Sequence, residues 1–390
     1  MKQPWEEYQA VYVHIPFCVQ KCLYCDFASY ANCGENIKAQ YIQALCQEIK
    51  NDIELPVNPQ ATIYFGGGTP STLSAEKIDI IVTALKAKGL WQQPLEATIE
   101  VNPGTVDLPK LQALKSLGFT RISMGVQSLN DQELRTIGRI HTAQQALDAI
   151  AMAQQAGFQH INADVIYGLP VQSLDSLKET LTQLTATAID HISVYGLIVE
   201  ENTTLAKLLD QGKLTLPDED IAADMYDFVQ AFLKQQGFTR YEVSNYYRSG
   251  ANSYSRHNDV YWHYYPYAAF GASAASFDGS VRITRPAAIR DYLNWVAAGT
   301  DNAANEKYNC IIERLTKAEQ LSEFLMMGLR RSQGASLAEA HKRYSVDVLQ
   351  KYQHELEPFI QQKLVEIKNN GLYLTEKGMA VGNQIFEIFV

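Results

Sequence analysis

A regular alternation of two kinds of segment runs through the first 240 residues, and it is the strongest limit on the possible folds. Short apolar, β-branched or aromatic segments, typical of buried strands, occupy residues 11–17, 61–65, 97–101, 121–126, 161–167 and 191–197. Amphipathic segments typical of helices occupy residues 38–52, 75–88, 108–116, 143–155, 174–185 and 221–236. Six such units in series predict an α/β fold with a parallel sheet, either an open doubly wound sheet or a partial (β/α) barrel. In both architectures the functional groups lie at the carboxyl ends of the strands.

The pattern changes after about residue 240. Residues 244–267 contain seven of the 22 tyrosines together with Trp262, and a turn-rich stretch follows. Helical patterns return at 316–331, 336–344 and 346–363, and a hairpin-like pattern ends the series at 365–374. We therefore expect three parts: a barrel domain over 1–240, an aromatic-rich connecting region over 241–310, and a small, mainly helical, winged-helix-like domain over 311–390.

Charge and hydropathy exclude several classes of partner. With 33 basic and 43 acidic side chains the formal charge is −10, whereas nucleic acids and anionic membranes attract basic surfaces. The winged-helix-like module is therefore expected to pack against the chain, not to bind nucleic acid. No run of 18 apolar residues is present, and the first residues lack the apolar stretch of a secretory signal. A cytoplasmic protein without an integral membrane segment is expected.

Three of the six cysteines lie within eight residues, directly after the first predicted strand. Cys18, Cys22 and Cys25 read C-x₃-C-x₂-C, whereas the other three cysteines are scattered. Thiolates are soft ligands, and three of them suit a four-iron cluster with one open iron better than structural zinc, which usually takes four ligands. An open iron can hold a chelating small molecule. The alternative is that the i, i+4, i+7 spacing places three core cysteines on one helix face.

Polar or glycine-rich strings follow the next predicted strands. Residues 66–70 read GGGTP, and glycines let a backbone approach a ligand closely, although such a string is also an ordinary turn. Glu100 ends the third strand, where it is either a hydrogen-bond acceptor for a ligand or a solvated carboxylate. Gln127 and Asp164 lie within or just beyond apolar strands, where a buried polar group needs a partner.

These motifs together resemble those of radical S-adenosylmethionine (SAM) enzymes. The string from Tyr12 to Cys18, YVHIPFC, is similar to the coproporphyrinogen dehydrogenase group of that superfamily, the oxygen-independent coproporphyrinogen III oxidase-like family. The resemblance implies a partial (β/α)6 TIM-like barrel with a C-terminal accessory domain. It also implies a [4Fe-4S] cluster held by Cys18, Cys22 and Cys25, which uses one electron to split SAM into methionine and a 5′-deoxyadenosyl radical. The residues that the resemblance places around SAM are Tyr12, Tyr24, Gly67, Gly68, Thr69, Glu100, Gln127, Arg139 and Asp164.

Two features separate this chain from the coproporphyrinogen oxidases of that family. Members that oxidise coproporphyrinogen III carry a further cysteine two positions after the third, where this chain has Phe27. Residues His257 to Trp262 match an HNxxYW string that marks the heme-chaperone branch, the HemW-type proteins. An exposed imidazole can be an axial ligand of heme iron, so His257 is the candidate heme ligand. Chemistry alone favours the alternative, a hydrogen-bonded structural histidine in an aromatic cluster, and it is the resemblance that favours the heme ligand.

The resemblance therefore implies a heme chaperone that binds heme, SAM and an iron–sulfur cluster and passes heme to an acceptor hemoprotein. An electron donor such as a flavodoxin or ferredoxin is a possible further partner. The alternative is an oxygen-independent coproporphyrinogen III oxidase. Radical SAM machinery is expected in both cases, and Phe27 argues against the oxidase activity.

Overall fold

The centre of the protein is a curved mixed sheet. A computed structural model describes residues 2–51 and 56–389, and within that part of the chain twelve strands join this sheet. In spatial order they are β14 (Ile311–Arg314), β13 (Val281–Thr284), β12 (Ala275–Phe277), β11 (Tyr267–Phe270), β1 (Tyr8–Ile15), β4 (Val57–Gly67), β5 (Ala97–Val101), β6 (Arg121–Gln127), β7 (His160–Tyr167), β8 (His191–Gly196), β10 (Asn245–Arg248) and β9 (Phe238–Arg240). In this spatial order the strands β11, β1, β4, β5, β6, β7 and β8 are parallel to one another. The next strands on either side, β12 and β10, pair antiparallel with them.

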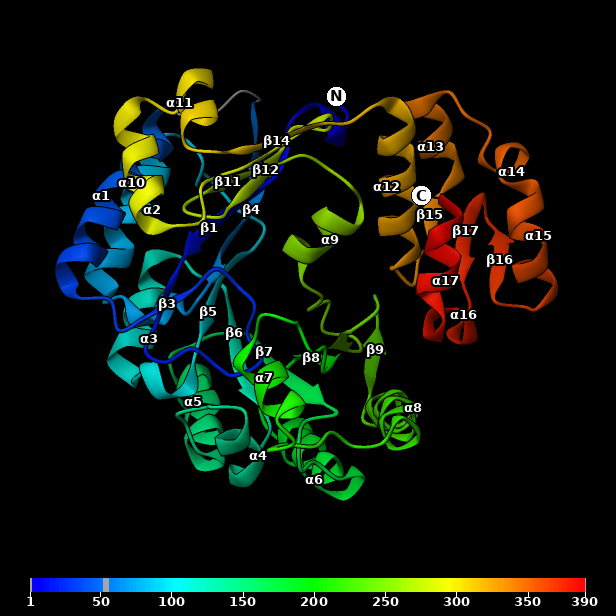
Figure 1. Ribbon diagram of the computed structural model, residues 1–390, viewed down its shortest axis with the longest axis horizontal. Coiled ribbons are helices and arrows are strands. Elements are labelled where there is room, and N and C mark those ends of the chain that lie inside the picture. The colour runs from blue at the N-terminus through cyan, green and yellow to red at the C-terminus, as the bar shows by residue number, and fades with distance from the viewer. Residues whose placement is uncertain (1, 52–55, 390) are drawn as a thin grey trace.

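Helices connect the strands of the sheet, and those between successive parallel strands lie on its outer side (Figure 1). The longer ones are α1 (Glu35–Asn51), α2 (Ala75–Ala87), α3 (Leu108–Leu117), α5 (Ala143–Gln155), α6 (Leu174–Thr185) and α8 (Glu219–Gln235). The shorter ones are α4 (Asp131–Thr136), α7 (Thr204–Asp210), α9 (Arg256–Trp262), α10 (Ile289–Ala298) and α11 (Asn302–Lys307). The predicted partial (β/α) TIM-like barrel is confirmed, and each of the six predicted strands and six predicted helices has its counterpart. Asp52, the last residue of the first predicted helix, lies outside the described residues.

The two faces of each parallel strand differ in chemistry, and this difference positions the site. Successive side chains point to opposite faces of a strand. On β6, β7 and β8 the alternate residues Ile122, Met124, Ile161, Ala163, Val165, Ile192 and Val194 belong to one buried apolar core. Their neighbours in sequence Ser123, Asn162, Asp164, His191, Ser193 and Tyr195 line a cavity. The helices therefore pack on the apolar face of the sheet, and the polar face lines the barrel interior.

The region between residues 241 and 310, expected as a connection, contributes four strands to the sheet. β11 runs parallel to β1, from Ala10 opposite Tyr267 to Val13 opposite Phe270. The sequence did not indicate this strand because it has only four residues inside a turn-rich stretch. The expected division of the chain at 240/241 and 310/311 stays a prediction.

The C-terminal region is mainly helical and has its own core. Its elements are α12 (Lys317–Leu329), β15 (Ala335–Ser336), α13 (Leu337–Tyr344), α14 (Val348–Lys351), α15 (Gln353–Gln361), β16 (Val365–Lys368), β17 (Gly371–Leu374), α16 (Glu376–Ala380) and α17 (Gly382–Phe386). The strands pair in the order β15-β17-β16, a winged-helix-like arrangement beside the barrel (Figure 1). Tyr264 and Phe277 from the sheet side are part of this core, so it packs directly on the barrel. No helix among the described residues is long and apolar enough to cross a membrane.

Candidate functional site

The three clustered cysteines lie on a non-helical loop that crosses the carboxyl ends of the strands. β1 ends at Ile15, and the chain then pairs Phe17 and Cys18 with Tyr30 and Ala31 as strands β2 (Phe17–Cys18) and β3 (Tyr30–Ala31). This pairing closes the loop between them. The backbone of Leu23 holds its middle to the barrel, since its N–H donates to Ile137 at 3.0 Å and its carbonyl accepts from Leu205 at 2.8 Å. The alternative of three core cysteines on one helix face is therefore wrong.

Two of the three thiols have polar neighbours from different parts of the barrel. Cys18 Sγ lies 3.7 Å from Thr69 Oγ1, and Arg139 Nη1 donates to Cys22 Sγ at 3.4 Å. Burial raises the pKa of the Cys18 and Cys25 thiols. No three or more His, Cys, Asp or Glu side chains of the described residues form a group suited to one metal ion. A cluster makes a different demand, because its thiolates bind separate irons and need not share one centre.

The glycine-rich turn after β4 packs against the cysteine loop. The N–H of Gly68 donates to Ile15 and that of Thr69 donates to Phe17, at 2.9 and 2.8 Å. A Cβ on Gly68 would lie 2.8 Å from the Phe17 carbonyl oxygen, and one on Gly67 would lie 2.6 Å from the His14 ring. Gly67 also has φ +116°, a conformation that other residues rarely adopt. The turn therefore needs glycine to bring its backbone against the loop.

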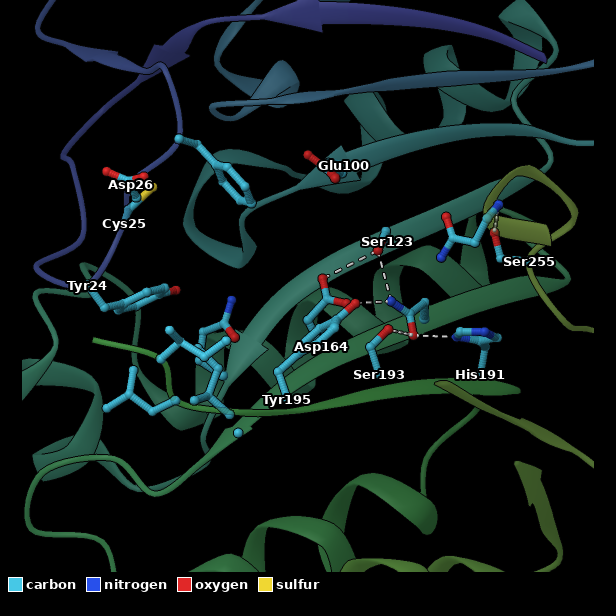
Figure 2. A pocket seen from close by; sticks show the side chains of 18 of the residues that line it. Tyr24, Cys25, Asp26, Glu100, Ser123, Asp164, His191, Ser193, Tyr195 and Ser255 are labelled. Atoms are coloured by element: carbon cyan, nitrogen blue, oxygen red, sulfur yellow. Dashed lines mark hydrogen bonds between the residues drawn. The ribbon is translucent and has the colours of Figure 1, made fainter. Parts of the chain in front are cut away.

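Two partly buried carboxylates face the cavity beneath this loop (Figure 2). Glu100 accepts hydrogen bonds from Tyr64 Oη at 2.8 Å and from the Gly67 N–H at 3.0 Å. Burial raises the pKa of Glu100 to about 7, and the nearby charge of Asp164 adds to this rise. Burial also raises the pKa of Asp164, which accepts from Asn162 Nδ2 at 2.8 Å. Both groups can accept hydrogen bonds from the ammonium or hydroxyl groups of a ligand.

Gln127 and Arg139 hold buried polar atoms without a partner. The β6–β7 register shifts between Gly125 and Gln127, and Gln127 has φ +67°. Within the described chain, Gln127 Oε1 and Arg139 Nε find no hydrogen-bond partner. Such a conformation and such atoms cost free energy, and they are typical of sites where a ligand completes the structure.

Most of the predicted SAM residues lie around two adjoining cavities. One cavity of about 430 Å³ is lined by Tyr24, Cys25, Glu100, Gln127 and Asp164, among others. The second, of about 340 Å³, is lined by Tyr12, Gly67 and Tyr267 and shares Glu100 and Phe27 with the first. Gly68 and Thr69 line neither of these two cavities, because their backbone packs against Ile15 and Phe17 at the start of the cysteine loop. The Phe27 side chain is 70% exposed at the shared rim.

Sequence reasoning missed the polar floor of the cavity. Asn162 Oδ1 accepts a hydrogen bond from His191 Nδ1 at 2.7 Å, and His191 Nε2 lies 2.9 Å from Tyr241 Oη. Figure 2 shows Ser123, Asp164 and Ser193 in the same network. The signal was present as polar residues at positions 160, 162 and 164 of one strand and at positions 191, 193 and 195 of the next. Only the strand register shows that these positions face one another.

The expected exposure of His257 is wrong. His257 is 1% exposed, its Nδ1 lies 2.9 Å from Thr62 Oγ1, and its Nε2 lies 3.0 Å from Tyr261 Oη. The ring stacks on Tyr64 with centroids 4.9 Å apart, and burial lowers the pKa of His257 to about 3. Both nitrogens are engaged in this structure. Heme ligation by His257 stays a prediction, and it requires one of these hydrogen bonds to break.

The start of α9, which carries His257, is fixed by a buried ion pair. Glu96 accepts from Arg121 Nε at 2.9 Å and from the backbone N–H groups of Arg256 and His257, each at 3.2 Å. Glu96 and Arg121 are each 3% exposed. At the other end of α9 the Trp262 Nε1 is buried without a partner among the described residues.

Comparison with known proteins assigns family models to both ends of the chain. The model of the radical SAM superfamily matches residues 12–184, and that of the HemN C-terminal domain matches residues 315–381. The chain is 34% identical to the heme chaperone HemW of Lactococcus lactis subsp. lactis over 98% of this chain and 97% of that protein. It is 32% identical to the heme chaperone HemW of Bacillus subtilis, over 98% and 99% of the two chains.

A solved structure has the same fold over nearly the whole chain. Coproporphyrinogen III oxidase (HemN) of Escherichia coli, a radical SAM enzyme, matches with a TM-score of 0.83. The match covers 99% of this chain and 90% of that one at 23% identity, so it supports the fold alone.

Proposed function

Since the chain belongs to the HemW family of radical SAM proteins, we propose that it is a heme chaperone. In this proposal it binds heme, a [4Fe-4S] cluster and SAM, and passes heme to an acceptor hemoprotein in the cytoplasm, with a flavodoxin or ferredoxin as a possible electron donor. The observation that carries the proposal is the 34% identity to a protein of that name over 98% of this chain and 97% of that protein.

Cys18, Cys22 and Cys25 are the proposed cluster ligands. The loop between β2 and β3 holds them over the carboxyl ends of the strands, where Thr69 and Arg139 lie beside Cys18 and Cys22. Arg139 is the proposed hydrogen-bond donor to the Cys22 sulfur when that sulfur binds iron. When bound, the cluster supplies single electrons to SAM.

The proposed SAM site uses the atoms that the protein itself leaves unsatisfied. Gln127 Oε1 and Arg139 Nε can hydrogen-bond a ligand without giving up a protein partner. The backbone of Gly67 and Gly68 and the hydroxyl of Thr69 are proposed to hold the amino group, with Glu100 and Asp164 accepting from the ligand's polar groups and Tyr12 and Tyr24 beside it. The loop that carries Tyr24 and Cys25 keeps this site partly shielded from water.

The alternative function, coproporphyrinogen III oxidation, is supported by the shared fold of the oxidase structure. Phe27 argues against it, because an exposed phenyl ring stands where the oxidases carry a cysteine, and a phenyl ring offers neither a proton nor a metal ligand. We therefore propose the chaperone function for this chain.

Two assays on the full chain, reconstituted without oxygen, test this proposal. A hemin titration followed by the Soret absorbance should reach saturation at a single heme per chain. Incubation with SAM, a reductant and coproporphyrinogen III should give no catalytic formation of protoporphyrinogen. Absence of heme binding, or multiple turnovers of coproporphyrinogen, would overturn the proposal.

A further inference from the structure

A third cavity lies outside the barrel, between α8 and the C-terminal region. It measures about 700 Å³, against about 430 Å³ for the cavity beneath the cysteine loop. Its walls include Leu216 and Tyr226 from the α8 side and Met379 from α16, and these two helices lie near each other in Figure 1. Pockets for organic ligands of about 300–1,000 Å³ occur preferentially between domains. Leu216 is 39% exposed, so the cavity has an uncovered apolar wall.

Tyr226 offers this cavity a ligand for iron. Its hydroxyl accepts hydrogen bonds from Arg240 Nη1 and Nη2, each at 3.4 Å, and the guanidinium carbon lies 5.8 Å from the ring centroid. Tyrosine oxygen is one of the axial ligands that heme iron takes in proteins, so the Tyr226 side chain brings a donor atom for iron to the wall of this cavity. Met379 adds a polarisable thioether to the opposite wall.

The cavity adjoins the proposed SAM site through the end of β8. Gly196 and Leu197 line both cavities. A Cβ on Gly196 would lie 2.8 Å from Tyr167 Oη, so glycine allows Tyr167 to pack against the strand and form part of the outer wall. Gly196 and Leu197 therefore belong to the walls of both cavities.

The charges at the rim suit a cationic iron centre. Glu219 and Asp227 line the cavity from exposed positions on α8. Their carboxylates repel other carboxylates and attract the positive charge that ferric iron adds to a porphyrin ring. A porphyrin in this cavity would therefore turn its propionates to bulk solvent.

Building on the proposed heme-chaperone function, we propose that heme binds in this cavity, with the Tyr226 oxygen as an axial ligand of its iron. Tyr167, Leu216 and Met379 supply apolar contacts to the macrocycle. As the iron–oxygen bond forms, the Tyr226 hydroxyl releases its proton to solvent, and no oxidation or reduction accompanies the step. Heme would then lie beside the cluster and SAM but outside the barrel.

Hemin titration of the full chain with three variants tests this site. Ala223→Trp places an indole into the cavity from an exposed position of α8, and it should lower hemin affinity more than about tenfold. Ala231→Trp, about two turns further along the same helix and also exposed, is the matched control and should bind as the wild type does. Tyr226→Phe keeps the ring, and it should shift the Soret band and weaken binding.

The outcomes separate this inference from the function on which it rests. Wild-type hemin binding that neither Ala223→Trp nor Tyr226→Phe alters would overturn the site and leave the chaperone function standing. If His257→Ala shifts the Soret band and Tyr226→Phe does not, the site is likewise overturned and the chaperone function still stands. A wild-type chain that binds no hemin would overturn both.

Discussion

The end of the barrel beneath the cysteine loop and the start of α9 both carry family motifs, but Gln127 and Arg139 beneath the loop keep unpartnered polar atoms, whereas the His257 imidazole at α9 has both nitrogens bonded. Beneath the loop, Gln127 has φ +67° and an unpartnered side-chain oxygen, and Arg139 Nε is unpartnered among the described residues. At α9, both nitrogens of His257 are hydrogen-bonded, and Glu96 is paired with Arg121 and caps the helix.

This difference is the one expected between the proposed ligand site and a structural joint. Buried polar groups are normally satisfied, and strained or unsatisfied ones collect where a ligand supplies the missing partner. Substitutions at α9 should therefore cost stability and leave SAM binding intact. Substitutions beneath the loop should weaken SAM binding and raise the stability of the apo chain. This trade-off is expected where a site is strained for function.

The largest effect is expected at Glu96. Glu96→Ala leaves the buried Arg121 guanidinium without its carboxylate and removes the cap of α9, which should cost about 3–5 kcal/mol of unfolding free energy. Urea unfolding of the apo chain measures this. Glu35→Ala is the control, because Glu35 is exposed and its pairs with Lys38 and Lys77 lie at the surface. Equal midpoints for the two variants would contradict a structural role for Glu96.

A smaller loss is expected at His257. His257→Ala removes two side-chain hydrogen bonds and leaves the hydroxyls of Thr62 and Tyr261 without a partner, at a cost of about 2–3 kcal/mol. The iron content after reconstitution should stay at the wild-type level. A variant as stable as the wild type would show that these hydrogen bonds are dispensable. His257 could then ligate heme iron without a loss of stability.

Glu100→Gln should raise stability at high pH and weaken SAM binding. The folded chain raises the Glu100 pKa to about 7, so the folded state binds this proton more tightly than the unfolded state. Stability therefore falls as pH rises from about 4.5 to about 7, and the loss persists above that range. Glutamine removes this cost, so the variant should gain about 2–3 kcal/mol near pH 8 and nothing below about pH 4.5.

Thermal unfolding of both proteins across that pH range, with calorimetric titration of SAM into the reconstituted chain, measures both effects of Glu100→Gln. A stability gain that does not change with pH would contradict the assignment to the Glu100 carboxylate.

The smallest effect is expected at Gln127. Gln127→Gly relieves the left-handed conformation and removes the unpartnered oxygen, which should stabilise the apo chain by about 1 kcal/mol. Gln127→Ala is the matched variant, because it removes the oxygen and keeps the strain, so it should gain less. Both should bind SAM more weakly than the wild type. If glycine destabilises the chain more than alanine does, φ +67° is not a strained position here.

Much of the barrel could be predicted because its signals are local. The strand at 97–101 and the helices at 143–155 and 174–185 have the bounds that apolar periodicity predicts. The helix predicted at 346–363 is two helices in the structure, since the chain leaves helical geometry at Tyr352. The β11 strand was missed because four residues carry too little periodicity to predict a strand.

The site was predicted in part, and the missing part depends on contacts between distant segments. The spacing of Cys18, Cys22 and Cys25 placed them on one loop, but their non-helical path follows from the pairing of Cys18 with Ala31. The burial of His257 depends on Thr62, 195 residues away in sequence. No pattern within the HNxxYW string distinguishes a buried imidazole from an exposed one.

Iron and acid-labile sulfide in the chain, reconstituted without oxygen, test most directly whether the cysteine loop is a cluster site. The wild type should hold about four irons and four sulfides per chain. Replacing Cys18, Cys22 and Cys25 together by alanine should remove both, whereas replacing Cys33 and Cys46 should change neither. A colourless wild type without sulfide, or full iron content in the triple variant, would contradict the account.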